Sequence, residues 1–472
     1  MPIQIITIYD ITESKRINGI NYASLSILLN EISMLLLNNK KTFKGGVHPK
    51  AYKELTENLP FEIMPAPKQV IIPLSQHTGK PARPLIKKGN EVKTGELIAE
   101  QNGFISSNIH SSVTGKVIKI GQAVNSTGLL RESIFIETYE TEEFIKLPPL
   151  NIEKVSSEEI ILRVKEAGIV GLGGAAFPTH VKLSPPPDKK IDYVILNGCE
   201  CEPYLTRDYR LMLERTDDVI SGLRLIMKAV NVNKGIIGIE DNKIEAIQKL
   251  EKAVSNFPEI SVIALKTKYP QGAEKMLIKA ATKREVPPGK LPFDVGCIIQ
   301  NIGTAVSIYD AVTNGEPQIT AALTVSGKGI YQPKNLIVKV GTPLMDVLNF
   351  CGGIKEDAVK IIVGGPMMGF AQYDLSVPIT KATSGILVLT KEEAFNFDET
   401  NCLRCGKCVE VCPLNLIPTR LARLTQFERY DDAKKLGITV CMECGTCTFN
   451  CPANIPLVQW IRLGKQKVVS LT

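Results

Sequence analysis

The feature that most constrains this sequence is a cysteine pattern that occurs twice near its C-terminal end. Each copy has the spacing C-x2-C-x2-C-x3-C and is followed by proline; the cysteines are Cys402, Cys405, Cys408, Cys412, Cys441, Cys444, Cys447 and Cys451. In this spacing, three thiolates bind one [4Fe-4S] cluster and the fourth, which follows a turn, reaches the other cluster. The repeat therefore predicts two [4Fe-4S] clusters.

We assign the two predicted clusters to exchanged sets of cysteines. One set is Cys402, Cys405, Cys408 and Cys451, and the other is Cys441, Cys444, Cys447 and Cys412. The alternative, structural zinc, usually pairs C-x2-C knuckles across a longer spacer. The segment between the repeats, 418–437, is rich in Leu, Ala and Arg and predicts one helix, so we expect a helical domain.

Length and charge exclude several classes of protein. A chain of 472 residues with 44% apolar residues is too long for one hydrophobic core, so we expect several domains. The net charge of +7 comes from basic residues scattered among acids, which gives no support to nucleic-acid binding. No run of about 18 uncharged apolar residues occurs, which argues against a transmembrane helix.

A glycine-rich loop follows a predicted helix in the middle of the chain. Apolar residues recur at helical spacing from Ser156 to Ala167, and Gly171, Gly173 and Gly174 come next. Such a loop can hold phosphate with its backbone N–H groups. A dinucleotide-binding fold places a strand before its glycines, so the ordinary fingerprint is weak here, and a simple tight turn is the alternative.

The next predicted strand, 191–196, ends in a polar segment. Asn197, Glu200 and Glu202 stand at its carboxyl end, where α/β sheets place their ligand sites. The alternative is a solvated acidic loop. Cys199 and Cys201 have no further metal-ligand residues nearby in sequence, and we predict that both are unligated.

Two of these motifs carry a family resemblance. The loop ending Gly-Gly-Ala-Ala-Phe-Pro-Thr and the segment Asn-x-x-Glu-x-Glu-Pro resemble the FMN and NADH site of the flavoprotein subunit of respiratory complex I. With Thr42–Pro49, Pro73–His77 and the cysteine-rich tail, the chain from Thr42 onward resembles the RnfC family, whose members are subunits of the Rnf electron transport complex, a ferredoxin:NAD oxidoreductase.

The resemblance implies noncovalent FMN and a site for NAD(H). It places the glycines beside FMN or NADH, Asn197 on the flavin, and the two glutamates near nicotinamide or ribose. The implied site residues are Gly171, Gly173, Gly174, Phe177 (stacking on an NADH ring), Lys182 (phosphate), Asn197, Glu200, Glu202, Asn301 and Thr304. Two departures from complex I stand out: its glycine loop contains an arginine, and it has an acid where Cys199 stands here.

The resemblance also implies a function. We expect a peripheral subunit, at the cytoplasmic face of the cell membrane, of an ion-translocating oxidoreductase. It would pass electrons between ferredoxin-derived carriers and NAD(H) through FMN and the clusters. Its partners would be the other Rnf-type subunits, with ferredoxin reached indirectly through one of them. Because the cofactors carry the chemistry, we assign no catalytic side chain. The alternative is an iron-sulfur relay subunit without its own flavin.

The expected fold class is multidomain α/β. We interpret residues 1–41 as an extension that a start assigned too far upstream would explain. Residues 42–150 predict a β-rich barrel-sandwich domain, 151–315 an α/β domain for FMN and NADH, and 316–390 a small β-grasp-like domain. Residues 391–472 predict a helical two-cluster ferredoxin-like domain.

Overall fold

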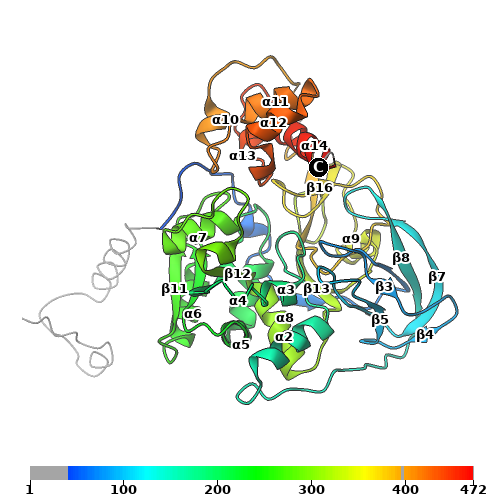
Figure 1. The fold of residues 1–472 in the computed structure, drawn as a ribbon. Coiled ribbons are helices and arrows are strands. Elements are labelled where there is room, and N and C mark those ends of the chain that lie inside the picture. The colour runs from blue at the N-terminus through cyan, green and yellow to red at the C-terminus, as the bar shows by residue number, and fades with distance from the viewer. Residues whose placement is uncertain (1–40, 395–397, 471–472) are drawn as a thin grey trace, which may run out of the picture. The chain divides into compact units, whose positions relative to one another are not determined.

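The computed structural model describes residues 41–394 and 398–470, so the predicted extension lies outside the described residues except for Lys41. Figure 1 shows the described elements in order along the chain. They begin with the short 3-10 helix η3 (Lys53–Leu55) and strand β1 (Phe61–Ile63). No helix among these residues has the length and apolar character needed to cross a membrane.

Two small sheets follow and pack on each other. One has the order β2-β8-β7-β4, and the other has the order β3-β5-β6. Their facing apolar side chains, among them Val70, Ile98 and Ile134, form a separate core. The bounds are β2 (Gln69–Pro73), β3 (Arg83–Pro84), β4 (Glu91–Val92), β5 (Leu97–Glu100), β6 (Ile109–His110), β7 (Gly115–Val124) and β8 (Leu130–Thr138).

The central sheet is parallel throughout, in the order β11-β10-β9-β12. Its strands are nearly continuous apolar runs, as expected for a parallel sheet covered on both faces. They are β9 (Tyr193–Gly198), β10 (Gly235–Glu240), β11 (Ile260–Leu265) and β12 (Cys297–Asn301). The predicted strand 191–196 corresponds to β9, which begins two residues later.

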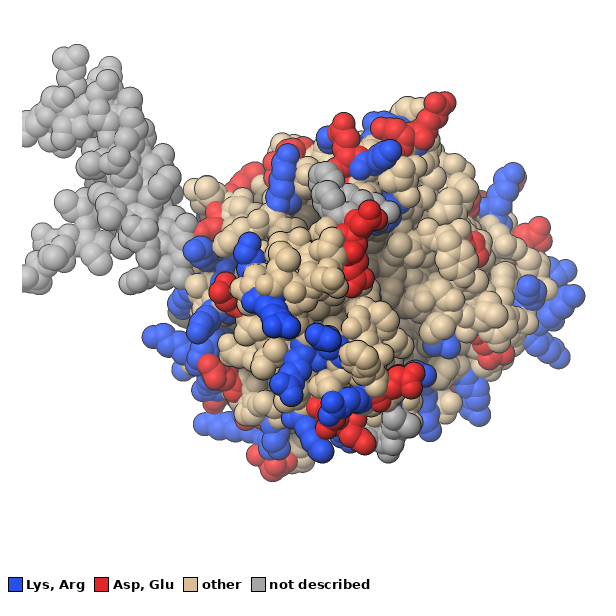
Figure 2. Space-filling view, turned by 90° about the horizontal axis from the view of Figure 1, so that it is seen from above, with Lys and Arg blue, Asp and Glu red and all other residues tan. Residues whose placement is uncertain are grey.

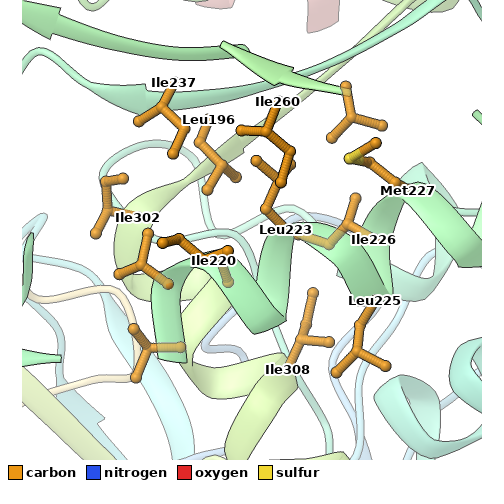
Figure 3. Close-up of a cluster of buried hydrophobic side chains, with 14 of the residues drawn as sticks. Leu196, Ile220, Leu223, Leu225, Ile226, Met227, Ile237, Ile260, Ile302 and Ile308 are labelled. Atoms are coloured by element: carbon orange, nitrogen blue, oxygen red, sulfur yellow. The ribbon is translucent and has the colours of Figure 1, made fainter. Parts of the chain in front are cut away.

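Helices cover both faces of this sheet. α5 and α8 pack with the sheet residues Leu196 and Ile237 into the largest apolar cluster (Figure 3). α7 packs on the other face through Leu277 and Ile278. The helices are α2 (Ser157–Glu166), α3 (Thr179–Lys182), α4 (Arg207–Glu214), α5 (Thr216–Ala229), α6 (Ile244–Ala253), α7 (Glu274–Thr282), η4 (Pro292–Val295) and α8 (Ile302–Thr313).

The predicted helix from Ser156 to Ala167 is present as α2. Ser156 accepts a hydrogen bond from the N–H of Glu159, and the Glu159 side chain accepts one from the N–H of Ser156. This reciprocal capping box fixes the helix start, and Ala167 caps its end. The helix therefore delivers the chain directly into the glycine loop.

A third sheet has the order β1-β14-β13-β17-β15-β16. Its elements are β13 (Thr320–Ser326), β14 (Lys334–Lys339), α9 (Leu344–Phe350), β15 (Ala358–Val363), β16 (Phe370–Ala371) and β17 (Gly385–Thr390). β1 pairs with β14 in parallel, although it precedes the two small sheets in sequence. One strand of the predicted 42–150 domain thus belongs to a different sheet.

The C-terminal part is helical. It contains α10 (Lys407–Glu410), α11 (Pro418–Gln426), α12 (Tyr430–Lys435), η5 (Ile438–Val440), α13 (Thr446–Phe449) and α14 (Leu457–Ser470). The prediction of one helix over 418–437 is wrong, because the chain turns between α11 and α12. Glu428 adopts a left-handed backbone conformation there, with φ of 55°, and a helix cannot continue through it.

Candidate functional site

The carboxyl ends of the central strands bring two predicted site residues together. β9 and β12 are neighbours, and their register pairs Asn197 with Asn301. The amide of Asn197 donates to the carbonyl of Gly272 at 2.8 Å and accepts from the N–H of Cys199 at 3.2 Å. Asn197 therefore fixes the start of the loop that follows β9, at the sheet edge where ligands bind.

The glycine loop lies over the N-terminal end of α8. The N–H of Leu172 donates to Thr304 Oγ1 at 3.0 Å, and a Cβ added to Gly173 would lie 3.0 Å from Asn301 Nδ2. Gly173 has φ of +73°, a conformation that side chains disfavour. Gly174 is exposed, and a Cβ added to it would meet no atom within 4 Å. The main chain of this loop is therefore open to a ligand.

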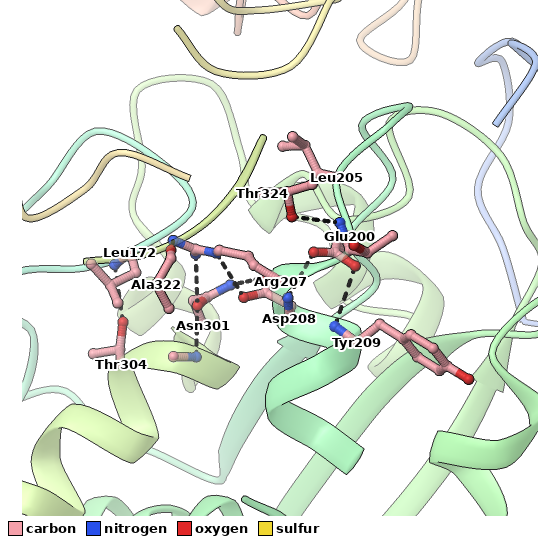
Figure 4. A network of polar contacts seen from close by, with 12 residues as sticks. Leu172, Glu200, Leu205, Arg207, Asp208, Tyr209, Asn301, Thr304, Ala322 and Thr324 are labelled. Atoms are coloured by element: carbon pink, nitrogen blue, oxygen red, sulfur yellow. Dashed lines mark hydrogen bonds and ion pairs between the residues drawn. The ribbon is translucent and has the colours of Figure 1, made fainter. Parts of the chain in front are cut away.

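Asn301 is held from three directions (Figure 4). Its Oδ1 accepts from the N–H of Gly303 at 2.8 Å and from the Arg207 guanidinium at 3.3 Å, while its Nδ2 donates to Asp208 Oδ2 at 2.7 Å. Arg207 is only 2% exposed and pairs with Asp208 at 3.1 Å. Sequence reasoning missed Arg207 and Asp208, because only the fold brings α4 beside the end of β12.

Glu200 and Glu202 point to different partners. The Glu200 carboxylate accepts from the N–H groups of Asp208 at 2.7 Å and Tyr209 at 3.3 Å, at the start of α4 (Figure 4). Burial raises the pKa of Glu200 to about 7, although neighbouring Lys53 acts in the opposite direction. Both oxygens of Glu200 are thus bonded to the protein, and the residue fixes its own loop.

Glu202 keeps one oxygen without a hydrogen bond. Its Oε2 accepts from the N–H of Met367 at 3.0 Å, whereas its Oε1 is buried and has no partner among the described residues. Burial raises the pKa of Glu202 to about 7. The hydroxyl of Tyr269 is nearby and is also buried without a hydrogen bond in the described part of the chain. Glu202 and Tyr269 thus each place a buried oxygen without a hydrogen bond in this part of the site.

Two buried lysines hold the loop that carries these glutamates, and sequence reasoning identified neither. Lys53 Nζ donates to the carbonyls of Glu200 at 2.8 Å and Glu202 at 2.9 Å, and also to that of Leu205. Lys243 Nζ donates to the carbonyl of Cys199 at 2.7 Å. Their charges oppose those of nearby carboxylates, so they orient the loop and lower the cost of burying acids.

Lys182 and Phe177 flank the site, and both already have partners within the protein. Lys182 Nζ pairs with Glu274 at 2.9 Å and donates to the carbonyl of Ile299 at 3.3 Å. A phosphate bound by Lys182 would have to share this ammonium group with Glu274. The ring of Phe177 is half-buried, while its carbonyl accepts from the N–H of Gly171 at 2.8 Å and closes the glycine loop.

The eight C-terminal cysteines form two groups. Cys402, Cys405, Cys408 and Cys451 line one cavity and are called the outer cysteine group here. Burial and the nearby thiols of Cys444 and Cys412 raise the pKa of Cys441 to about 11. Burial raises the pKa of Cys447 to about 12, and the nearby thiols of Cys441, Cys444 and Cys412 act in the same direction. Cys412, Cys441, Cys444 and Cys447 form the inner cysteine group. The fourth cysteine of each repeat thus lies with the other repeat.

The arrangement of the outer cysteine group suits an iron-sulfur cluster. Its four cysteines surround a cavity. Thiolates that surround a volume suit a [4Fe-4S] cluster, whose sulfur ligands bind separate iron atoms.

The inner cysteine group packs directly on the central domain. Cys444 forms one buried cluster with Val47 and Tyr269, against which Cys201 and Met367 also pack. A Cβ added to Gly445 would lie 2.8 Å from the carbonyl of Met367, so the two segments are in close contact. Because Cys201 immediately precedes Glu202, the inner cysteine group lies beside the Glu202 loop.

Comparison with known families accounts for most of the described chain. The Nuo51 FMN-binding domain matches residues 164–310, and the RnfC barrel sandwich hybrid domain matches 41–141. The SLBB domain matches 323–371, and the 4Fe-4S dicluster domain matches 394–452. FMN and two 4Fe-4S clusters are thereby confirmed as cofactors, and so is the multidomain α/β class. The fold and the site define an iron-sulfur flavoprotein.

Curated relatives narrow this class to one family. The relative from Clostridium ljungdahlii, a subunit of a proton-translocating ferredoxin:NAD(+) oxidoreductase complex, is 51% identical over 84% of this chain and 87% of its own. The relative from Acetobacterium woodii, a subunit of an Na(+)-translocating complex of the same kind, is 46% identical over 91% of this chain and 97% of its own. The chain belongs to this family, the RnfC subunits of ion-translocating ferredoxin:NAD oxidoreductase complexes. The resemblance seen in the sequence is confirmed.

Proposed function

We propose that this chain is the NAD(H)-reacting subunit of an ion-translocating ferredoxin:NAD oxidoreductase, bound peripherally at the cytoplasmic face of the membrane. It acts with the other subunits of the complex, and ferredoxin reaches it indirectly through one of them. The observation that carries the proposal is the position of the inner cysteine group, which packs with Tyr269, Met367 and Cys201 beside the loop that carries Glu202. The proposed cluster site and the proposed flavin and NADH site thus lie in parts of the chain that pack directly on each other.

We assign the flavin site to the glycine loop and the two strand-end asparagines. Bound FMN exchanges two electrons with NAD(H) and one at a time with clusters. The open main chain at Gly174 supports close approach of the cofactor to Gly171, Gly173 and Gly174. Asn197, Asn301 and Thr304 are fixed by hydrogen bonds before any ligand arrives, so they orient it without reorganising.

We assign the NADH side of the site to Phe177, Lys182, Glu200 and Glu202. Glu202 has one buried oxygen that accepts no hydrogen bond from the described residues, and we assign a ribose hydroxyl or amide to it, whereas Glu200 shapes the loop through α4. The eight cysteines of the outer and inner groups are the proposed cluster ligands. The proposed domain limits are 42–150, 151–315, 316–390 and 391–472, with the third unit β-grasp-like, because α9 packs on its sheet, and the fourth ferredoxin-like.

The test is anaerobic purification of the chain expressed alone, with flavin and iron quantified and absorbance followed on adding NADH. About one FMN and about eight irons per chain, with NADH bleaching both chromophores, are expected. Eight irons without flavin or bleaching would make the chain a relay subunit. Zinc in place of iron would contradict the assignment of the cysteines.

A further inference from the structure

The two cysteine groups have opposite surroundings. In the inner cysteine group, Cys444 and Cys447 are buried, and Cys444 packs against the central domain. In the outer cysteine group, Cys402 and Cys405 are exposed, and every residue from 401 to 407 is exposed as well. A cluster held by the outer cysteine group therefore lies at the molecular surface.

The mouth of the outer cavity is unusually apolar for an exposed surface. Leu403 is 65% exposed, Phe427 is 67% exposed and Ile417 is 48% exposed, and all three line the cavity that the outer cysteines surround. Contiguous exposed apolar side chains rimmed by polar ones mark interaction sites. Aromatic residues and arginine are the types enriched at such interfaces.

Three exposed arginines rim the same mouth. Arg404, Arg420 and Arg423 line the cavity and are exposed, and in the described part of the chain none of them forms an ion pair. Segment 402–429 holds five basic residues and two acidic ones. Figure 2 looks down on the side where Figure 1 draws α10–α14, and both basic and acidic side chains there border uncharged surface.

We propose that this surface is where another subunit of the complex docks and exchanges single electrons with the outer cluster. The docking face consists of Leu403, Arg404, Ile417, Arg420, Arg423 and Phe427. Its partner is a protein with an acidic face around its own one-electron redox centre. The inference rests on the proposed function, because the cavity exchanges electrons only if it holds a cluster.

Charge and chemistry favour this occupant over two others. A second copy of this chain would present the same basic face, and like charges across an interface are repulsive. An anionic membrane would satisfy the arginines, but lipid against Cys402 and Cys405 would leave the exposed cluster without an electron donor or acceptor. An acidic redox protein satisfies both the arginines and the exposed cluster.

The first experiment reverses the charge of the docking face in the assembled complex. Membranes carrying Arg404→Glu/Arg420→Glu/Arg423→Glu are supplied with ferredoxin, kept reduced by a titanium(III) salt, and NAD+, and NADH formation is followed. At low salt we expect the rate to fall by at least about tenfold, and its decline with added KCl to disappear. The matched control, Lys87→Glu/Lys88→Glu/Lys116→Glu, changes three exposed lysines, two in the loop between β3 and β4 and one in β7, and should behave as wild type.

The same variants distinguish a failure of the docking proposal from a failure of the proposed function. NADH should still bleach the flavin and clusters of the purified triple variant, because that reaction needs no partner. If the triple variant contains less iron than wild type, Arg404→Gln/Arg420→Gln/Arg423→Gln is tested in its place. An unchanged rate and salt dependence with full iron would overturn the docking face, whereas wild-type protein that NADH cannot bleach would overturn the function instead.

A second measurement identifies the occupant directly. Benzoylphenylalanine at position 427 is irradiated in intact membranes, with the same residue at position 244 as control, where Ile244 is 63% exposed on α6. We expect an adduct from position 427 with an Asp- and Glu-rich segment of another subunit. An adduct with lipid or with a second copy, or equal yields from both positions, would overturn the proposal.

Discussion

Glu200 and Glu202 lie two positions apart on one loop, yet their carboxylates meet different parts of the protein. Glu200 has φ of 45° and turns toward the N–H groups of α4, while Glu202 turns toward Met367. Burial raises the pKa of both side chains to about 7. The pattern of acids in the sequence indicates that they stand at a strand end, but their directions depend on distant residues such as Lys53.

We predict that Gly174→Ala leaves the fold intact and weakens the binding of FMN. The position is exposed, has no atom within 4 Å of an added Cβ, and does not have the positive φ of Gly173. A methyl group in the space where FMN approaches the main chain should cost about 1–3 kcal/mol, or roughly 5- to 150-fold in Kd. Fluorescence titration of the deflavinated Gly174→Ala chain with FMN measures it.

The control for this substitution is Gly121→Ala in β7, where the added Cβ meets only the flexible end of Lys119. It should leave both the thermal midpoint and the Kd for FMN unchanged. Unaltered FMN affinity in Gly174→Ala would mean that the flavin does not approach this part of the loop.

Lys381 is predicted to make stability depend on pH. Its ammonium group is buried and donates to the carbonyls of Asn108 at 2.8 Å and Gly168 at 2.7 Å, and burial lowers its pKa to about 7. The neighbouring His77 and His110 have pKa values lowered chiefly by burial to about 4 and about 3, so both stay neutral above pH 7.

The direction of this pH dependence follows from the number of protons that Lys381 binds in the folded and in the unfolded state. Between about pH 7 and 10.5 the unfolded lysine binds a proton that the folded one has lost, so this group makes stability rise with pH; below pH 7 its burial costs the full penalty, on the order of 5 kcal/mol. We expect Lys381→Met to flatten the rise of the thermal midpoint between pH 7 and 9.5. Exposed Lys391→Met is the control, and equal slopes in Lys381→Met and wild type would contradict the assignment.

At the scale of elements, α5 and α8 approach each other closely at one glycine. A Cβ added to Gly222 would lie 2.1 Å from the carbonyl oxygen of Ala305. Alanine in place of an exposed helical glycine stabilises by about 1 kcal/mol, but here we expect a net loss of about 1–3 kcal/mol from overpacking. The fall in thermal midpoint of Gly222→Ala measures it, with half-buried Ser221→Ala as the neutral control. A raised midpoint would show that the helices can separate at little cost.

Local signals in the sequence predicted single elements well and their partners poorly. The helical spacing of apolar residues from Ser156 to Ala167 made α2 predictable. No glycine or proline marks the turn at Glu428 in the sequence, so one helix was predicted where there are two. The pairing of β1 with β14, and the placing of Arg207 under the glycine loop, are long-range contacts that no local pattern encodes.

At the scale of the whole molecule, the helical C-terminal part should depend on its iron. Its helices are short, from four residues in α10 to 14 in α14, and helices of such lengths are marginal alone. Its core includes Cys408 and Cys447 of the two cysteine groups. We expect anaerobic chelation to unfold residues 398–470 while the three sheet-containing parts remain.

Limited proteolysis checks this prediction. Chelated protein should be cut within 398–470 and yield a stable fragment that contains the central sheet. Chelator saturated with iron beforehand should leave the pattern of intact protein. Resistance of the iron-free C-terminal part would show that its apolar core suffices.

The segment that carries Lys53 has a consequence for how the chain folds as it is made. Lys53 donates to the loop after β9, β1 pairs with β14, and the N–H of Gly46 donates to the carbonyl of Val411. At ribosomal speed, Val411 follows Gly46 after roughly 20–70 s. During that interval the segment around Gly46 and Lys53 has no complete set of partners, so the nascent chain cannot mature strictly domain by domain.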